Sequence, residues 1–160
     1  MITADRLREL VHYCPETGIF THLQSRGRVK AGTIAGCNSN GYTVIRLDTI
    51  LYPAHRLAWL YVHNHIPNGD VDHIDGNKSN NQICNLRDVD RSTNLQNQKC
   101  ASSRNKSSGL LGVSKRENGT FRSYIQIDGK YVSLGTFKYA QEAHEAYLAA
   151  KRIHHKGCTI

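Results

Sequence analysis

Paired cysteines, long hydrophobic runs and acidic residues are all scarce in this sequence of 160 residues. Its five cysteines form no Cys-x-x-Cys pair, and their odd number argues against both a zinc knuckle and a disulfide framework. We expect five reduced thiols, mostly buried, in a cytoplasmic protein. No secretory signal is visible, and no apolar run is long enough to cross a bilayer, so we expect no membrane insertion.

The shortage of acidic residues leaves the chain strongly basic. Lys and Arg number 21 against 13 Asp and Glu, which gives a net charge of +8 and a pI near 9.4. Residues 101–160 hold 10 basic and 4 acidic side chains, so most of the excess is C-terminal. This balance favours a polyanionic partner or an acidic membrane surface. The length allows one ordinary domain or two small ones.

The stretch from residue 71 to 97 carries the residue types that phosphodiester hydrolysis needs. That reaction requires a base to take a proton from water and a divalent cation to neutralise charge on the phosphate. His73 has an ordinary pKa of about 6.5, and Asp72 offers a hard oxygen ligand for magnesium or manganese. Neighbouring side chains of a strand point to opposite faces, so both reach one site only where the strand ends or bends. The run Asp75-Gly76-Asn77 predicts such a turn.

A second oxygen ligand is expected, and Asn94 is our candidate. Asp90 can cap a helix that begins after it and turns Leu95 inward, and such a helix would hold Asn94 rigidly. Taken singly, an Asp-His pair on a turn is usually a solvated loop, and an Asn-rich run usually marks caps and turns. The order and spacing of these pieces together favour a catalytic site.

This part of the sequence resembles the HNH endonucleases, especially their phage-type and intron-type homing members. The resemblance lies in the frame Asp-His-x-Asp/Asn-Gly, followed by Asn-Leu-Arg and by Asn-x-x-Asn. The three residues that correspond to the letters of the family's name are His73, Asn85 and Asn94. The resemblance implies a ββα-metal fold, two short strands and a helix, that holds one divalent cation beside the scissile phosphate. By this likeness Asp72 and Asn94 are metal ligands, His73 is the general base, and Asn85 hydrogen-bonds the turn and holds His73 in place. Many family members have His where this sequence has Asn94, whose neutral amide favours Mg²⁺ or Mn²⁺ over zinc.

Several residues near this frame are secondary candidates. Asn97 would support the helix or touch phosphate, and Asp75 is either a turn residue or a ligand. The string His-Arg-Leu-Ala-Trp resembles the segment that precedes the motif in homing-type relatives, so His55 and Arg56 would face DNA; a lone histidine is more often a packing residue. The basic loop 26–30 is either a solvated hairpin or a phosphate-contacting arm.

The N-terminal part of the chain predicts a small antiparallel sheet with two helices. Residues 3–12 have the spacing of an amphipathic helix with Thr3 as a cap. A turn and strand are expected in residues 13–21, and further short strands at 32–36 and 41–47. A second helix over residues 53–62 begins with a proline near its first turn and sends Leu57, Trp59, Leu60 and Tyr61 into the core.

A polar segment of residues 101–109 predicts a linker, after which the pattern changes. Short strands are expected at 112–116, 121–127 and 130–135, joined by two-residue turns at Asn-Gly and Asp-Gly. A helix over residues 139–155, rich in alanine, covers the apolar face of this meander. The opposite face stays open to solvent or to a duplex groove.

This C-terminal pattern resembles the Apetala-two DNA-binding domain, which is also found fused to phage HNH nucleases. The resemblance lies in Gly112-Val113, in the Leu134-Gly135-Thr136-Phe137 corner and in the helix motif Ala-x-x-Ala-x-x-Ala-Tyr. Plant members place tryptophans on the DNA face, where this sequence has Asn118 and Ser133. The likeness implies that the residues at or near DNA are Arg116, Asn118, Thr120, Arg122, Tyr124, Gln126, Tyr131 and Ser133.

Taken together, the sequence predicts an α+β protein with an HNH nuclease domain (1–100), a linker (101–109) and an Apetala-two-like DNA-binding domain (110–160). We expect a metal-dependent endonuclease that cleaves duplex DNA by nicking and acts as a monomer or weak dimer on DNA. One alternative is a non-catalytic DNA-binding regulator with a structural ββα unit. Another is a recombination or packaging factor that recognises branched DNA.

Overall fold

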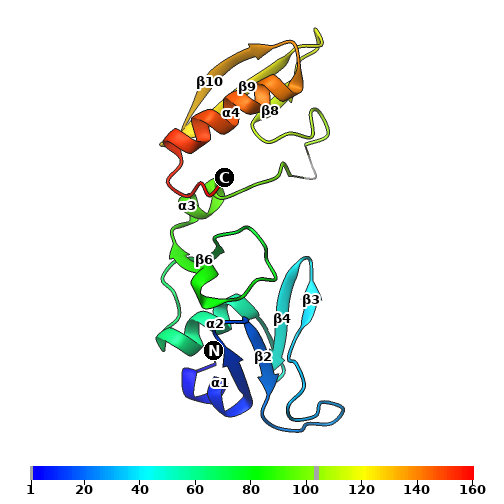
Figure 1. Ribbon diagram of the computed structural model, residues 1–160, viewed down its shortest axis with the longest axis vertical. Helices are drawn as coiled ribbons and strands as arrows, with labels where there is room; N and C mark the ends of the chain where they lie inside the picture. Colours follow the sequence, from blue (N-terminus) through cyan, green and yellow to red (C-terminus); the bar gives the residue numbers. More distant parts are fainter. Residues whose placement is uncertain (1, 103–104) are drawn as a thin grey trace. The chain divides into compact units, whose positions relative to one another are not determined.

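The chain is an α+β protein that divides into two compact units, residues 1–91 and 92–160. The computed structural model describes residues 2–102 and 105–160 (Figure 1). The limits that the sequence predicts for the two domains, at residues 100 and 110, stay predictions.

The first unit begins with a short helix that leads directly into a hairpin. Helix α1 (Ala4–Leu10) starts at Thr3, whose side chain accepts a hydrogen bond from the Arg6 amide at 3.2 Å, as the sequence predicts. The helix ends earlier than predicted, because Val11 takes an extended conformation and opens strand β1 (Val11–Cys14). The side chain of this β-branched residue is fully buried in the strand. Strand β1 pairs antiparallel with β2 (Ile19–His22).

A three-stranded antiparallel sheet follows, in the order β3-β4-β5. Its central strand β4 (Tyr42–Leu47) agrees with the prediction, whereas β3 (Cys37–Ser39) and β5 (Ile50–Pro53) were not predicted. The strand expected at residues 32–36 is not formed: that segment has backbone hydrogen bonds to Phe20 and His22 and an isolated bridge between Thr21 and Ile34, but it is not a regular strand. Its glycines adopt positive φ angles, which a regular strand does not accommodate.

Helix α2 (Ala54–His63) and the paired strands β6 (Asp70–His73) and β7 (Leu86–Val89) complete the first unit. A single 3₁₀ turn, η1 (Ile83–Asn85), precedes β7. Leu57 and Leu60 are buried in the core, and Trp59 and Tyr61 pack against it partly buried, as the helix periodicity predicts. The core therefore ties α2 to the strand that carries Asp72 and His73.

The second unit is a three-stranded meander covered by one helix (Figure 1). After the short helix α3 (Arg91–Gln96), strands β8 (Val113–Lys115), β9 (Phe121–Ile127) and β10 (Lys130–Phe137) pair in the order β10-β9-β8. Asp128 and Gly129 both have positive φ, as a tight primed hairpin turn requires. Helix α4 (Ala140–His154) buries Ala143, Tyr147 and Ala150 against the sheet. The predicted order of strands and helix is confirmed in this unit.

Part of the predicted linker is held by side-chain hydrogen bonds. The Asn105 amide donates to the Leu110 carbonyl at 3.0 Å, and the Ser108 hydroxyl donates to the Val113 carbonyl at 2.7 Å. Residues 103 and 104 of that linker lie outside the described residues. The segment 105–110 is therefore attached to the start of β8.

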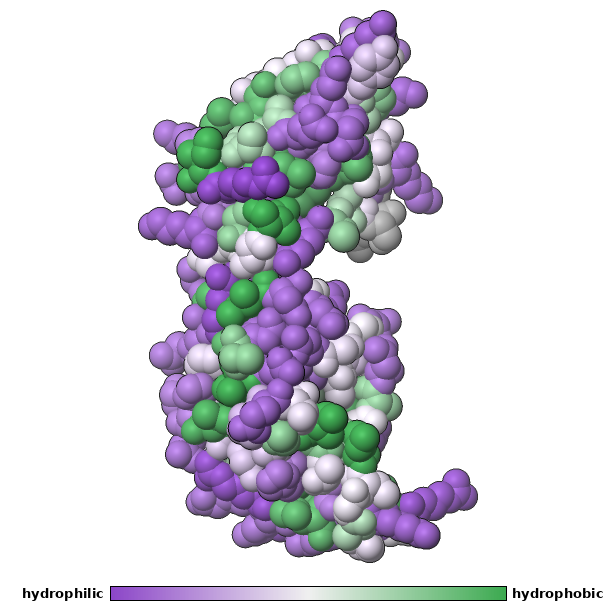
Figure 2. Space-filling view, viewed as in Figure 1, coloured by the Kyte–Doolittle hydropathy of each residue, from purple (hydrophilic) through white to green (hydrophobic). Residues whose placement is uncertain are grey.

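The cysteines correct one expectation from the sequence. All five are free, as expected, but none is buried: Cys37, Cys84 and Cys100 are exposed, and Cys14 and Cys158 are half-buried. No helix in the described part of the chain has the length and apolar character of a membrane span. On the visible face of each unit, hydrophobic residues form patches among hydrophilic ones (Figure 2).

Candidate active site

Asp72 and His73 are adjacent on β6 and both are buried, at 7% and 5% exposure. In the antiparallel pairing with β7, Asp72 lies opposite Arg87 and His73 lies opposite Leu86. The two side chains have different neighbours, because successive residues of a strand project to opposite faces. His73 is the last residue of β6, so the strand ends where the predicted turn begins.

One oxygen of the Asp72 carboxylate accepts two hydrogen bonds from a single arginine. Arg87 donates from Nε at 3.0 Å and from Nη2 at 2.8 Å, and both hydrogen bonds end on Asp72 Oδ2. The Asp72 side chain is 8% exposed and that of Arg87 is 26% exposed. A charge-assisted pair so shielded from water fixes the carboxylate in one orientation.

The turn after His73 is organised by the side chain of Asn85, which is buried at 8% exposure. Its Oδ1 accepts from the Asp75 amide at 3.0 Å, while its Nδ2 donates to Asp75 Oδ1 at 3.0 Å and to the Asn80 carbonyl at 2.9 Å. The Ile74 amide also donates to the Asn85 carbonyl at 2.9 Å. Asn85 therefore bonds to both ends of the loop that follows His73, which is the contact expected of it.

His73 is oriented by Asn81, a residue that was not predicted to belong to the site. His73 Nε2 lies 3.3 Å from Asn81 Oδ1, and Asn81 Nδ2 donates to the Ser79 carbonyl at 3.1 Å. The second bond fixes the amide so that its oxygen faces the imidazole. An oxygen acceptor requires the hydrogen on Nε2, which makes Nδ1 the basic nitrogen of neutral His73. Burial lowers the pKa of His73, opposed mainly by the bond to Asn81, so the neutral form dominates at pH 7.

The aromatic rings of His55 and Tyr42 lie beside the His73 ring. The His55 ring, on α2, lies 5.0 Å from the His73 ring at an interplanar angle of 71°, and the Tyr42 ring lies 6.2 Å from it. His55 is 9% exposed, and burial, with the neighbouring His73 and Arg56, lowers its pKa to about 4. Its Nδ1 has no hydrogen-bond partner among the described residues. His55 is thus a buried, neutral packing residue beside His73 and not an exposed contact for DNA, whereas Arg56 is half-buried.

Asn94 and Asn97 belong to the second unit. Asn94 lies on α3, and Asn97 follows the helix, with its amide donating to the Asn94 carbonyl at 3.1 Å. Asn97 is buried at 5% exposure, in keeping with a residue that supports the helix. Leu95 is 56% exposed, so the expectation that it turns inward is wrong. The convergence of Asn94 with Asp72 on one cation stays a prediction.

The donor chemistry of Asp72 and Asn94 suits a hard divalent cation. One carboxylate and one amide oxygen match Mg²⁺ or Mn²⁺, which fill their other positions with water and phosphate oxygens. Among the described residues, no three His, Cys, Asp or Glu side chains come together at one place.

The residues expected at the DNA face divide into two groups. Within the sheet, Tyr131 pairs with Gln126 and Ser133 with Tyr124, while Arg122 pairs with Ser114 and Thr136. Most of these side chains are exposed, and the rings of Tyr124 and Tyr131 lie 5.8 Å apart. The second group is the β8–β9 turn, where Asn118 Oδ1 accepts from the Thr120 amide at 3.2 Å and hydroxyl at 2.6 Å and Arg116 is exposed.

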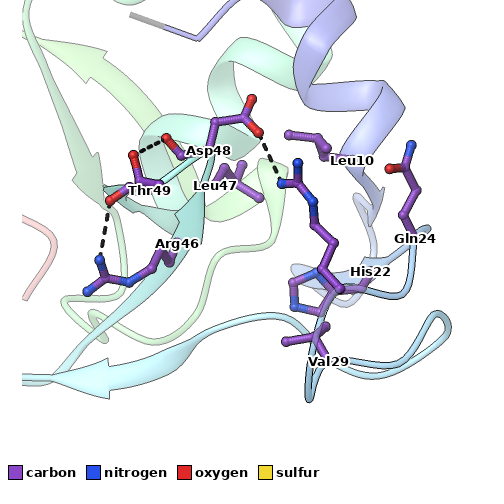
Figure 3. Close-up of a pocket in the computed structure, with 9 residues that line it drawn as sticks. Leu10, His22, Gln24, Val29, Arg46, Leu47, Asp48 and Thr49 are labelled. Atoms are coloured by element: carbon purple, nitrogen blue, oxygen red, sulfur yellow. Dashed lines mark hydrogen bonds and ion pairs between the residues drawn. The ribbon is translucent and has the colours of Figure 1, made fainter.

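A pocket of about 200 Å³ lies elsewhere in the first unit, and no predicted catalytic residue lines it. Asp48, one of the residues that line this pocket (Figure 3), accepts hydrogen bonds from Arg26 at 3.1 Å and from Arg6 at 2.9 Å. These arginines lower the pKa of Asp48 to about 2. Because Arg26 is paired here, the structure favours the solvated hairpin over the phosphate-contacting arm at that residue.

Arg87 and Asn81 were missed for different reasons. Arg87 stands in the Asn-Leu-Arg string, and aligning the two strands in antiparallel register would have placed it opposite Asp72. Asn81 lies in an Asn-rich loop, where sequence patterns suggest only caps and turns. No sequence periodicity distinguishes Asn81, whose side-chain amide contacts His73, from the other asparagines of this loop.

Comparison with known proteins gives one family and one solved structure. Residues 52–96 match the family model described as HNH endonuclease. No curated protein matches the chain. A solved structure titled "DNA binding and cleavage by the HNH homing endonuclease I-HmuI" is similar over 92% of this chain and 88% of that one, with 23% identity and a TM-score of 0.46. The segment that holds Asp72, His73, Asn85 and Asn94 is thus similar to an HNH endonuclease domain.

Proposed function

We propose that this protein is an HNH-type DNA endonuclease that hydrolyses phosphodiester bonds in duplex DNA with one divalent cation. The observation that carries the proposal is the pairing of His73 Nε2 with Asn81 Oδ1 at 3.3 Å. This pairing leaves a neutral imidazole with a basic Nδ1, next in sequence to a buried carboxylate, within a segment that matches the HNH family model.

In the proposed reaction, His73 Nδ1 takes a proton from water as the water oxygen forms a bond to phosphorus. The bond from phosphorus to the 3′ oxygen breaks, and the departing oxygen takes a proton from solvent. Asn81 keeps His73 in the required tautomer, and Asn85 holds the loop that follows it. These two asparagines are positioning residues, because neither touches the reacting atoms.

Asp72 and Asn94 are the proposed cation ligands, and Arg87 positions the Asp72 carboxylate. Bound Mg²⁺ or Mn²⁺ would supply charge neutralisation at the phosphate and the departing oxygen. Both bonds from Arg87 end on Asp72 Oδ2, so the contact holds the carboxylate by one of its two oxygens.

The C-terminal meander is the proposed duplex-binding module, of the Apetala-two type. Its open sheet face presents Arg122, Tyr124, Gln126, Tyr131 and Ser133, and the adjoining turn presents Arg116, Asn118 and Thr120. Arginine there provides affinity for phosphate, and the amide and hydroxyl groups can bond base edges. The basic excess of residues 101–160 supports the same role. One chain has one catalytic histidine of this kind, so we propose one nick per binding event.

A plasmid assay tests the proposed activity. Supercoiled DNA is incubated with the protein and Mg²⁺ or Mn²⁺, and conversion to the open circle is followed. His73→Ala should lower the rate by at least about 100-fold, the range in which a general base contributes. The matched control is His12→Ala, which removes an exposed histidine of β1 and should leave the rate unchanged.

Equal nicking by the His73→Ala variant would refute the assignment of the base. Binding of duplex DNA without strand breakage in any metal would instead indicate a non-catalytic DNA-binding regulator. A strong preference for cleaving branched over linear duplex would point to a recombination or packaging factor.

A further inference from the structure

Helix α3 is too short and too polar to hold its own shape. It spans Arg91–Gln96, buries no residue, and exposes 56% of its one large apolar side chain, Leu95. Nucleating a helix is unfavourable, and isolated helices shorter than about 12 residues are marginal in water. Ser92, Thr93 and Asn94 add little intrinsic helix propensity. The conformation of α3 therefore depends on tertiary contacts.

Contacts of this kind come from the last residues of the chain, in the same unit as the helix. The Gly157 amide donates to Gln96 Oε1 at 3.0 Å, and the Thr159 hydroxyl donates to Asn97 Oδ1 at 2.7 Å. The Lys151 ammonium donates to the carbonyl of Gln98. Three successive residues at the end of α3 are thus bonded to residues more than 50 positions later.

The approach of Gly157 to α3 is close enough to exclude any side chain. A Cβ atom at this position would lie 2.1 Å from the Thr93 carbonyl oxygen and 3.0 Å from Gln96 Cβ. Glycine is required here for space, since it allows one backbone to lie directly against another. The last residues therefore pack on the helix itself as well as hydrogen-bonding to its end.

Lys151 connects this contact to the rest of the second unit. It lies on α4 with 1% exposure, and its ammonium lies 5.9 Å from the centre of the Tyr147 ring. Tyr147 is part of the core between α4 and the sheet. A lysine buried in this way keeps its charge only with good acceptors, so its bond to the Gln98 carbonyl is costly to lose. The support of α3 thus continues through α4 to the core.

We propose that Lys151, Gly157 and Thr159 form a C-terminal clamp that positions α3 and, through it, the Asn94 amide. The proposal rests on the proposed function for the role of Asn94 as a cation ligand. These three are positioning residues: none supplies a ligand or a base. The second unit then has two proposed roles: duplex binding by its open sheet face and positioning of Asn94 by the clamp.

The sharpest test is a pair of substitutions at one position in the full-length protein. Thr159→Val removes the hydroxyl and keeps the branched shape, whereas Thr159→Ser keeps the hydroxyl that donates to Asn97. Hydrogen exchange of the amides of residues 93–98 should accelerate about fivefold in Thr159→Val, the change that losing one net hydrogen bond produces. Thr159→Ser should exchange like the wild type. Gly157→Ala should accelerate exchange more strongly, because its methyl group must push the chain end away from Thr93.

Two further measurements connect the clamp to Asn94. Binding of Mn²⁺ alone, followed by electron paramagnetic resonance, should weaken several-fold in Thr159→Val and recover in Thr159→Ser. Duplex affinity without metal should stay within about twofold of the wild type in both, since the clamp is separate from the proposed DNA face. Nicking at limiting Mn²⁺ should fall with Mn²⁺ affinity and recover partly at saturating Mn²⁺.

Several outcomes would overturn the proposal. Unchanged exchange at residues 93–98 in both Thr159→Val and Gly157→Ala would show that the clamp does not hold α3. Faster exchange with unchanged Mn²⁺ binding would show that the clamp holds the helix but does not position Asn94. Absence of nicking by the wild type would refute the proposed function, while exchange and Mn²⁺ binding would still decide the clamp. Because Thr159→Ser retains the hydroxyl, its recovery separates the lost bond from general unfolding.

Discussion

The imidazole of His73 and the side-chain oxygen of Asn81 lie 3.3 Å apart, on a strand and on a loop that are eight residues distant in sequence. The loop is fixed from behind, because the Tyr13 hydroxyl donates to the Asn81 carbonyl at 2.7 Å. A hydrogen bond in the core of the first unit thereby holds the backbone of the residue whose side chain contacts the proposed base.

Substituting Asn81 should impair catalysis without impairing DNA binding. Asn81→Ala removes the acceptor of Nε2, so the imidazole can rotate and take the other tautomer. Nicking under single-turnover conditions should slow by about 10- to 100-fold, the cost of a misplacement of about 1 Å at a reacting centre. Asn81→Asp keeps an oxygen at the Oδ1 position and should retain more of the rate. Equal rates for wild type and Asn81→Ala at saturating DNA would contradict the positioning role.

The ion pair of Asp72 and Arg87 leads to a prediction about stability. Arg87→Leu removes the guanidinium that bonds a buried carboxylate, and should lower the free energy of unfolding by about 2–3 kcal/mol, given the partial exposure of Arg87. Adding Asp72→Asn to this variant removes the buried negative charge and should restore part of the loss. Urea unfolding of the two single variants and the double variant measures both effects. Additive losses in the double variant would argue against a coupled pair.

Local signals in the sequence predict elements well where the determining contacts are themselves local. Thr3 caps α1 through a hydrogen bond three residues away, and the Asp128-Gly129 turn needs only two positive φ angles. The helix over residues 139–155 is observed as α4 (Ala140–His154), since its alanine spacing determines which face is buried. Each of these features lies within a few residues of its cause.

The candidate site is less predictable, because its geometry depends on contacts between distant segments. His73 and Asp72 stand out by residue type, but the neighbours that determine their properties come from α2, β4, β7 and the loop at Asn81. The prediction for Leu95 was wrong for a related reason. An apolar residue at a helical position was expected to be buried, yet Leu95 is exposed and the end of α3 is held by hydrogen bonds from polar groups. Helical periodicity cannot distinguish these two ways of attaching a helix.

Acid should destabilise the first unit through His55. Its pKa is about 4 when folded, below the ordinary value of 6.5 for an unfolded chain. Between these values the unfolded state binds the proton more tightly, so stability is complete above about pH 6.5 and falls as the pH drops towards 4. The loss should reach about 2–3 kcal/mol. Denaturant unfolding measured from pH 7 to pH 4.5 gives the free energy of unfolding as a function of pH. This free energy should fall less steeply with acid in His55→Leu, where only other groups such as His73 still take up protons on unfolding. An identical dependence on pH in the two proteins would contradict the prediction.

Two glycines with similar backbone angles should respond differently to alanine. Gly112 has φ of +74° and a Cβ there would lie 2.0 Å from the Tyr147 ring, whereas Gly119 has φ of +82° and open space around it. Gly119→Ala should cost about 1–2 kcal/mol, the penalty of a left-handed residue. Gly112→Ala adds displacement of a core tyrosine and should cost at least about 3 kcal/mol. Thermal unfolding compares the two variants, and equal losses would show that Tyr147 moves aside without cost.

The exposed arginine on the open sheet face leads to a prediction about how DNA affinity depends on salt concentration. Arg122 is exposed on β9 between Ser114 of β8 and Thr136 of β10, in the middle of the proposed DNA face. If its guanidinium contacts a phosphate, Arg122→Ala should reduce the slope of log affinity against log salt by about 1, with a uniform loss across duplex sequences. Arg122→Lys keeps the charge and should keep the slope. A sequence-dependent loss in Arg122→Lys would instead assign Arg122 to a base edge, because only the guanidinium fork bonds guanine with two parallel hydrogen bonds.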